Sequence, residues 1–188
     1  MKIIRGIYKN ISLFVPPHTR IPSLRVKKSL FDMIKENIEN SIILDLFAGS
    51  GSLGIEALSL GAKKIVFVEI RKKAVEIITK NLSLIKALSK AEIYLKDVFR
   101  AIKDFYRQNR KFNIIFLDPP YYKNLAFKTL QTLDEYDILA PHGLIISLFF
   151  YKEKIKKEFV YLSLINEKFY GDTQLLIYGK KSNLSRNF

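Results

Sequence analysis

The sequence predicts an α/β protein built around a doubly wound, mostly parallel β-sheet. From residue 41 onwards, short apolar runs alternate with amphipathic stretches of helical spacing. These apolar runs have no polar face, which is typical of parallel strands covered by helices on both sides. A glycine-rich turn after the first run opens a helix, the arrangement in which doubly wound folds bind a ligand.

The expected elements follow one another in a regular order. Residues 2–16 show the alternation of side chains that is typical of strands on both sides of the turn former Asn10. This predicts a small hairpin that ends at Pro16 and Pro17. Ser23 is a suitable N-cap for a basic, amphipathic helix that reaches residue 38. Strands are then expected within 41–47, 63–69, 91–97, 112–118 and 143–150, and helices within 53–61, 74–85, 98–108 and 125–136.

The C-terminal part departs from this alternation. Residues 156–180 contain two strand-rich runs around Tyr170-Gly171-Asp172, which has the composition of a turn. They predict a hairpin that adds an antiparallel strand to the sheet edge. The expected organisation is a basic hairpin and helix at 1–40, one α/β domain at 41–181 and a disordered tail at 182–188.

The charge of the chain favours a polyanionic partner. With 32 Lys and Arg against 18 Asp and Glu, the formal charge is +14. Since 24 of the basic residues are Lys, a general bias of composition is an alternative explanation. Residues 1–31, however, hold seven basic residues and no acidic one, which such a bias does not explain. The N-terminal segment is therefore the predicted polyanion-facing surface.

Several protein classes are disfavoured by what the sequence lacks. The chain has no cysteine, which excludes disulfides, thiolate zinc sites and cysteine nucleophiles, and its two histidines argue against a histidine-based metal site. No stretch approaches the ~20 apolar residues of a transmembrane helix. A soluble, cytoplasmic protein with no membrane partner is expected.

The first chemical motif is the glycine-rich turn within residues 45–54. Gly49, Gly51 and Gly54 form a G-x-G-x-x-G pattern between a strand and a helix, which lets a ligand approach backbone N–H groups. Glu69 ends the next strand and can accept hydrogen bonds from both ribose hydroxyls. The motif predicts a cofactor that contains a nucleoside.

Asp45 indicates which cofactor this is. A carboxylate beside the two phosphates of a nicotinamide dinucleotide is unfavourable, whereas the ammonium and sulfonium of S-adenosylmethionine (SAM) attract it. Asp45 therefore favours a methyltransferase, with S-adenosylhomocysteine as product, over a dehydrogenase. Asp97, after the third strand, suits either a hydrogen bond to the cofactor's adenine amino group or an N-cap, and the sequence leaves both open.

The second motif, Asp118-Pro119-Pro120-Tyr121, directly follows the fourth strand. The two prolines remove backbone donors, so a carboxylate and a carbonyl remain as acceptors for the two N–H groups of an exocyclic base amine. Tyr121 offers a face on which the base can stack. All four are predicted catalytic residues. The motif does not specify the purine, so N6-adenine methylation of RNA or DNA stays an alternative.

Taken together, these motifs resemble the RsmD-like family of bacterial methyltransferases, which act on guanine N2 of 16S ribosomal RNA. The resemblance covers nearly all of residues 1–180. The segments that carry it are Ile3-Ile4-Arg5-Gly6 with Tyr8-Lys9, Thr19-Arg20, Arg25-Val26 with Leu30-Phe31, residues 44–51, Gly54-Ile55-Glu56-Ala57, Asp118-Pro119-Pro120-Tyr121 and Tyr170-Gly171-Asp172-Thr173.

The resemblance implies a Rossmann-like SAM-dependent methyltransferase, monomeric and without a metal, that modifies 16S ribosomal RNA in an assembling small-subunit particle. A non-catalytic RNA-binding assembly factor is the alternative from another class. The expected cofactor-binding residues are Asp45, Phe47, Gly49, Ser50, Gly51, Glu69, Ile70, Asp97 and Val98. The expected RNA-binding residues are Arg5, Lys9, Arg20, Arg25 and Lys28.

The sequence departs from the family pattern at three places. Residues 20–25 read Arg-Ile-Pro-Ser-Leu-Arg where the family usually has Arg-Pro-Thr-Ser-Asp-Arg, which removes an acid. Asn10 stands where a glycine is usual, and Ser147-Leu148 where Glu-His is common. These departures concern RNA binding more than the reaction, because the motifs for the cofactor and the target base are intact.

Overall fold

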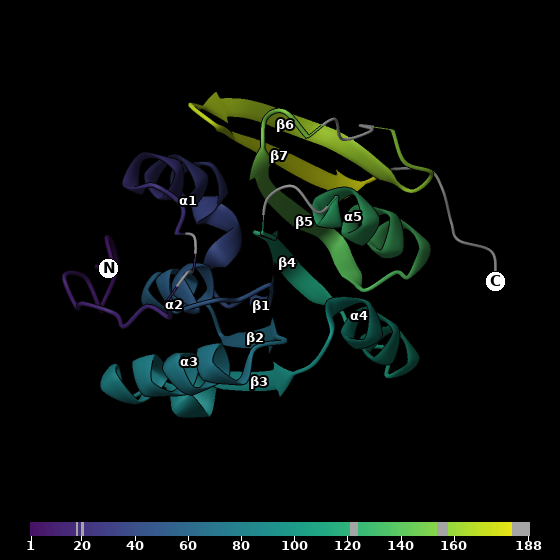
Figure 1. Ribbon diagram of the computed structural model, residues 1–188. Helices are drawn as coiled ribbons and strands as arrows, with labels where there is room; N and C mark the ends of the chain where they lie inside the picture. Colours follow the sequence, from purple (N-terminus) through teal and green to yellow (C-terminus); the bar gives the residue numbers. More distant parts are fainter. Residues whose placement is uncertain (18, 20, 121–123, 154–157, 182–188) are drawn as a thin grey trace.

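A computed structural model describes residues 1–17, 19, 21–120, 124–153 and 158–181. Its centre is a seven-stranded sheet in the order β3-β2-β1-β4-β5-β7-β6 (Figure 1). The strands are β1 (Ile42–Leu46), β2 (Lys64–Glu69), β3 (Ala91–Leu95), β4 (Phe112–Leu117), β5 (Leu139–Phe150), β6 (Leu162–Tyr170) and β7 (Thr173–Lys180). The helices are α1 (Leu24–Ile38), α2 (Ser52–Ser59), α3 (Lys72–Leu84), α4 (Val98–Arg107) and α5 (Leu125–Glu135), with a 3₁₀ turn η1 (Leu88–Lys90).

The topology confirms the predicted doubly wound sheet. Strands β1 to β5 pair in parallel, and β7 pairs antiparallel with both β5 and β6. The C-terminal hairpin therefore inserts its second strand between β5 and the edge strand β6. Strand β5 begins earlier than predicted, because Leu139 pairs with Phe112 before an irregularity in the ladder.

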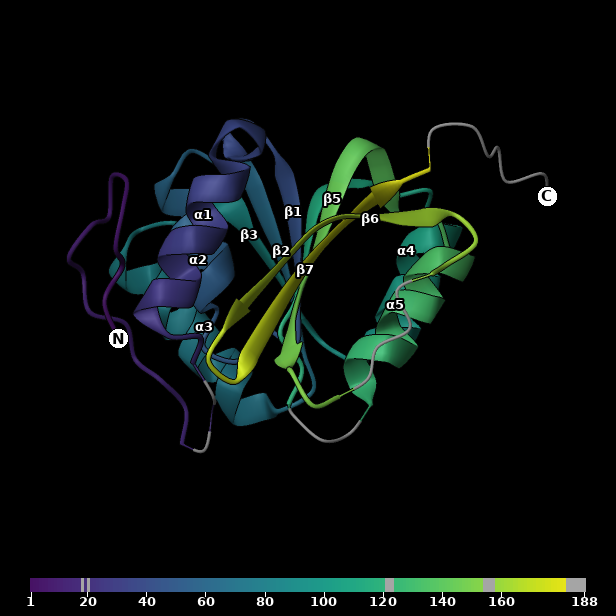
Figure 2. The same ribbon diagram turned by 90° about the horizontal axis from the view of Figure 1, so that it is seen from above.

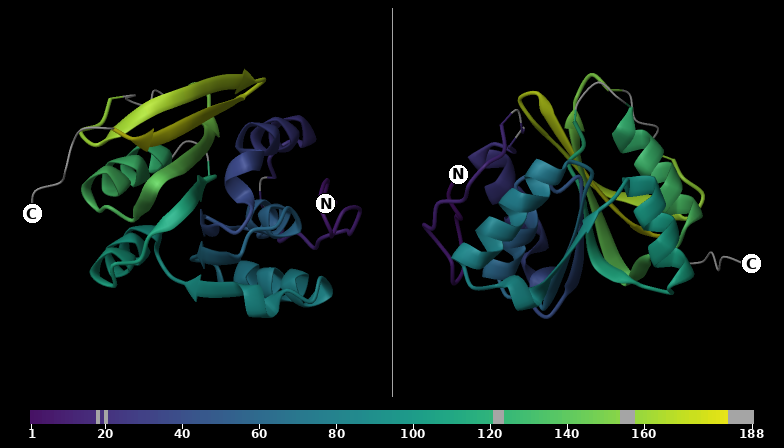
Figure 3. Two further views of the ribbon diagram at one scale, coloured as in Figure 1. Left: turned by 180° about the vertical axis from the view of Figure 1, so that it is seen from behind. Right: turned by 60° about the horizontal axis from the view of Figure 1, so that its bottom comes forward.

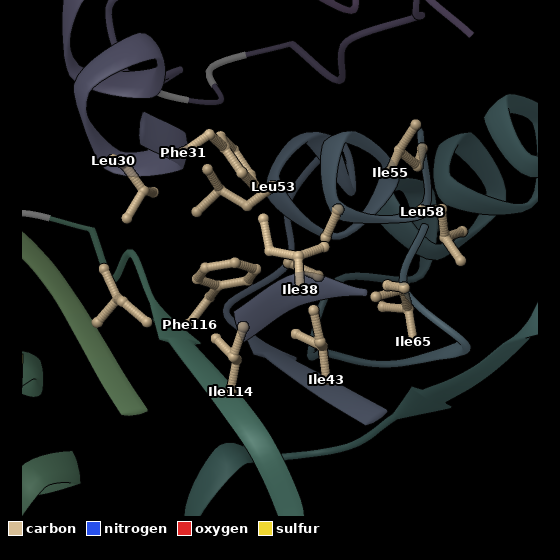
Figure 4. Packing of buried hydrophobic residues seen from close by; sticks show 14 of the residues in the cluster. Leu30, Phe31, Ile38, Ile43, Leu53, Ile55, Leu58, Ile65, Ile114 and Phe116 are labelled. Atoms are coloured by element: carbon tan, nitrogen blue, oxygen red, sulfur yellow. The ribbon is translucent and has the colours of Figure 1, made fainter. Parts of the chain in front are cut away.

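Helices cover both faces of the sheet, as the apolar strands predict. Helices α1, α2 and α3 lie on one face, and α4 and α5 on the other (Figures 2 and 3). Successive strand residues point to opposite faces, so Ile43 and Leu44 of β1 belong to different cores. On the α1 side, the rings of Phe31 and Phe116 meet edge to face with centroids 6.0 Å apart (Figure 4).

Helix α1 confirms the predicted N-cap, because the Ser23 hydroxyl accepts a hydrogen bond from the Val26 amide. No helix in the described ranges is long and apolar enough to cross a bilayer, the longest being α1 with 15 residues. The predicted tail at 182–188 lies outside the described residues.

The predicted N-terminal hairpin is present as a reversal held by backbone hydrogen bonds, but it has no regular strands. Within residues 1–17 the structure has an isolated antiparallel bridge between Lys2 and Ser12 and no strand. The amides of Ile4 and Arg5 donate to the Glu56 carboxylate of α2, at 2.8 to 3.2 Å. The segment reverses direction as predicted, because backbone hydrogen bonds join its two arms, and the bonds to Glu56 fix it on α2.

Two buried polar side chains hold this segment on the domain. Glu56 is fully buried and forms a 2.8 Å ion pair with Lys27 of α1, which is only 2% exposed. Asn81 of α3 is also fully buried. Its amide group donates to the carbonyls of Phe14 and Ser50, and its oxygen accepts from the Phe14 amide. The N-terminal segment is therefore tied to α1, α2, α3 and the glycine-rich turn.

Candidate active site

A cavity of about 820 Å³ lies at the carboxyl ends of β1, β2 and β4. It gathers almost every predicted cofactor-binding and catalytic residue that the structure describes. The predicted residues that line it are Asp45, Phe47, Gly49, Ser50, Glu69, Ile70, Asp97, Val98, Asp118, Pro119 and Pro120. Tyr121, the remaining predicted catalytic residue, lies outside the described residues.

The position of the cavity follows from the strand order. Strand β1 lies between β2 and β4. The strand order therefore runs outward from β1 in two directions, through β2 to β3 on one side and through β4 to β5 on the other. Doubly wound sheets open a crevice at this switch point. Asp45 of β1 pairs with Phe116 of β4. Asp118 comes two residues after Phe116, just past the end of β4, so it lies at the same edge of the sheet as Asp45.

The glycine-rich turn has the backbone geometry that its glycines permit. Gly51 is the N-cap of α2 at a φ of 76°, a left-handed conformation. A Cβ on Gly54 would lie 2.4 Å from the Phe67 ring, so glycine allows α2 to pack closely on β2. Gly51 is not among the residues that line the cavity. Its part in the structure is to shape the turn.

Asp45 lines the cavity and is only 3% exposed. Its Oδ2 accepts a 3.0 Å hydrogen bond from the Gly54 amide. Burial raises the pKa of Asp45 well above its usual value, against the effect of this hydrogen bond, and the charges of Asp118 and Glu69 act in the same direction as burial. The site therefore holds an acid that a cationic ligand would stabilise in its ionised form.

Glu69 already has protein partners. Its Oε2 accepts from the Gly49 amide at 2.8 Å, and its Oε1 accepts from the Arg71 amide at 2.9 Å. The Arg71 guanidinium also contacts this carboxylate, with Nε 3.2 Å from Oε1. Glu69 thus joins the tip of β2 to the glycine-rich turn. A ribose at Glu69 would share the carboxylate with these donors.

Asp97 confirms one of the two interpretations that the sequence left open, the N-cap. It is the N-cap of α4, and its Oδ1 accepts from the amides of Phe99 and Arg100 at 3.0 and 3.1 Å. The same residue lines the cavity. Both helix amides use one carboxylate oxygen, which leaves Oδ2 outside the capping interaction.

The structure adds cavity residues that sequence reasoning missed. Thr19 and Pro22, from the segment between the N-terminal reversal and α1, form part of the cavity wall. The Arg71 Nη1 lies 3.4 Å from the Thr19 hydroxyl across this wall. The resemblance had marked Thr19 as a family residue, but periodicity offers no signal that an irregular segment folds over a cavity.

The predicted RNA-binding residues do not all share one surface. Arg25 and Lys28 are exposed and line one groove beside α1. Arg5 forms an ion pair with Asp32, which lines the same groove. Lys9 is exposed on the N-terminal reversal. The fifth, at position 20, lies outside the described residues.

The sheet order, the antiparallel β7 and the acidic crevice at the strand tips define the Rossmann-like fold of SAM-dependent methyltransferases. A solved structure of the Escherichia coli protein yhhF has the same fold, with a TM-score of 0.84 and 27% identity over 97% of this chain and 99% of that one. A solved Haemophilus influenzae structure has a TM-score of 0.77 and 35% identity over 94% and 96% of the two chains. In the described ranges, no three His, Asp or Glu residues group as metal ligands.

The chain belongs to the family described as Conserved hypothetical protein 95, whose model matches residues 1–179. This confirms the predicted membership of the RsmD-like family. YlbH of Bacillus subtilis is 36% identical over 184 residues, which are 96% of this chain and all of YlbH. Ribosomal RNA small subunit methyltransferase D of Haemophilus influenzae is 38% identical over 151 residues, 77% of this chain and 76% of that protein.

Proposed function

We propose that this protein transfers the methyl group of SAM to the exocyclic N2 amine of a guanine in 16S ribosomal RNA. The observation that carries the proposal is that Asp118, Pro119 and Pro120 line the same cavity as the glycine-rich turn and its neighbouring acids. The names of relatives such as ribosomal RNA small subunit methyltransferase D of Haemophilus influenzae and of Escherichia coli support ribosomal RNA as the substrate. We further propose a monomer that acts on an assembling small-subunit particle.

The cavity suits SAM in size and charge. Its volume of about 820 Å³ falls within the ~300–1,000 Å³ of small-molecule sites. The cavity is lined by the carboxyl groups of Asp45, Glu69 and Asp97, which favour a ligand with an ammonium and a sulfonium. In this proposal Asp45 lies near the amino acid end, Glu69 at the ribose and Asp97 at the adenine. SAM supplies an electrophilic methyl group on a sulfonium leaving group.

The residues after β4 would hold the amine. The Asp118 carboxylate and the Pro119 carbonyl accept hydrogen bonds from its two N–H groups, because neither proline contributes a competing backbone donor. Both hydrogens are then held, and the nitrogen lone pair points into the cavity. As the N–C bond to the methyl group forms, the nitrogen gives up one proton, and the Asp118 carboxylate is the adjacent acceptor. Tyr121 would support the base after it leaves its stack.

The test is methylation of total RNA and of isolated small-subunit particles with labelled SAM, followed by nucleoside analysis. N2-methylguanosine is the expected product, and N6-methyladenosine would overturn the guanine assignment. Asp118→Asn should lower the rate about 100-fold or more with the SAM dissociation constant nearly unchanged. Glu76→Gln removes the charge of an exposed carboxylate on α3 and is the matched control. Undiminished transfer by Asp118→Asn would contradict the catalytic role.

A further inference from the structure

A second groove lies between α1 and the end of β6. It has a volume of about 690 Å³, and its lining includes Arg25, Lys28 and Ser29 on one side and Lys168 and Tyr170 on the other. The groove shares no lining residue with the cofactor cavity. Residues more than 130 positions apart in the sequence therefore form one surface, to which the sequence assigned only Arg25 and Lys28.

The groove opens at the same end of the sheet as the proposed catalytic residues. Tyr170 pairs with Thr173, and Thr173 pairs with Phe150 at the carboxyl end of β5. Because β4 and β5 are parallel neighbours, Asp118 also lies at this end. Figure 2 shows the turn between β6 and β7 close to α1 at this end of the molecule. A strand of RNA whose base reaches Asp118 would continue past the groove.

The groove is cationic. Arg25, Lys28 and Lys168 are all exposed, and within the described ranges none of the three is ion-paired. Its one acid among the lining residues, Asp32, is paired with Arg5. Asp32 also interacts with the charge of Lys28, but the cations of the groove outnumber this acid, and such an excess of positive charge attracts phosphates.

The groove also has a fixed aromatic ring. The Tyr170 hydroxyl forms a hydrogen bond with the Ser29 hydroxyl, which joins the hairpin to α1. The Arg25 guanidinium lies 5.9 Å from the centroid of the Tyr170 ring. An aromatic ring beside cations is the combination that single-stranded nucleic acid binds, by base stacking and phosphate contacts.

We propose that this groove binds unpaired RNA nucleotides that adjoin the methylated base. Arg25, Lys28 and Lys168 hold the phosphates, and Tyr170 stacks on a base. The inference rests on the proposed RNA methylation and deepens it, since it extends the RNA-binding surface from α1 to the C-terminal hairpin. Unpaired RNA fits the groove better than a duplex, because only unstacked bases can reach an aromatic ring.

The experiment measures the affinity of the full-length protein for a labelled, unpaired 12-nucleotide RNA between 0.05 and 0.5 M salt. Removing one cation that binds a phosphate of single-stranded RNA lowers the slope of log K against log salt by about 0.7. With 1 M salt as the reference, Lys168→Ala should therefore bind roughly fourfold more weakly at 0.15 M. Lys90→Ala removes an exposed lysine at the opposite edge of the sheet, before β3, and should leave both affinity and slope unchanged.

The aromatic contribution is tested at Tyr170. Tyr170→Ala should weaken binding roughly tenfold with little change of slope, because stacking carries no charge. Tyr170→Phe keeps the ring and should retain most of the affinity. Melting temperature and SAM affinity report whether each variant is folded, and the exposed Lys168→Ala tests the groove even where Tyr170→Ala does not fold.

Two results would overturn the inference. The first is that Lys168→Ala binds the RNA with the same affinity and the same salt slope as the wild type. The second is that the protein binds a 12-base-pair RNA duplex equally strongly and through Lys168, which would refute the preference for unpaired RNA. Methylation of small-subunit particles is measured in parallel. If the wild type methylates RNA and Lys168→Ala binds and methylates RNA as the wild type does, the RNA-binding role of the groove is refuted but the proposed function is not. If the wild type methylates no RNA, the proposed function fails instead.

Discussion

The ion pair between Lys27 and Glu56 should be a major determinant of stability, and Lys27→Met tests it. Methionine keeps an unbranched chain of similar length but removes the ammonium. Glu56, which is fully buried, would keep its bonds to the Ile4 and Arg5 amides and lose its only cation among the described residues. A carboxylate left unpaired in this way destabilises a protein by about 3–5 kcal/mol.

For a chain of this size, each kcal/mol shifts the melting temperature by about 2–4 °C, so Lys27→Met should melt about 6–20 °C lower. Urea unfolding with linear extrapolation measures the free energy directly. The control is Lys28→Met, which makes the same substitution at the exposed neighbour and should change stability by no more than about 0.5 kcal/mol. Equal effects of the two substitutions would refute the reasoning.

A double-mutant cycle separates the pair from its surroundings. Lys27→Met combined with Glu56→Gln removes both charges, so its cost should fall below the sum of the single costs by about 0.5–3 kcal/mol. Strict additivity would show that the two side chains do not stabilise each other. Lys27→Met should also weaken SAM binding, because the N-terminal segment that Glu56 holds continues to Thr19 and Pro22 on the cavity wall.

Two further predictions concern the cavity acids. The raised pKa of Asp45 means that the folded protein binds a proton there more tightly than the unfolded chain does. The destabilisation that this shift causes is absent below ~3.9, the pKa of an Asp in the unfolded chain, and is fully present above the pKa of Asp45 in the folded protein. Asp45→Asn should therefore raise the melting temperature of the ligand-free protein at pH 7 and weaken SAM binding, and a lower melting temperature would contradict this. Glu69→Gln should weaken SAM binding about 10- to 100-fold by calorimetry, as for loss of a charged hydrogen bond, and unchanged affinity would exclude the ribose contact.

The sheet and its cavity are predictable because their signals are local. Each central strand is a continuous apolar run, so its residues fit only a sheet covered on both faces. Glu69 ends such a run, Asp118 follows one and Asp45 is the penultimate residue of one, and parallel strands bring their carboxyl ends to one edge. The position of these acids therefore follows from strand order alone.

The path of the N-terminal segment is not predictable in the same way. The alternation of residues 2–16 fits a hairpin, but the amides of Ile4 and Arg5 bond to Glu56, more than 50 residues away. One signal was present in α1. Lys27 lies four and seven residues before Phe31 and Ile34, on the buried face, where a lysine requires an anion. The helical spacing shows that Lys27 requires an anion, but it does not show that Glu56 is that anion.

The place of β7 in the sheet has a consequence for how the protein is made. Residues 173–180 are almost entirely buried and separate β5 from β6, so the last strand within the described residues belongs to the interior of the sheet. Until it emerges from the ribosome, the long apolar edge of β5 stays unpaired, and such an edge can pair with other chains. A nascent chain that stops before Thr173 is therefore an aggregation-prone fragment, although every residue of its proposed catalytic site has already been translated.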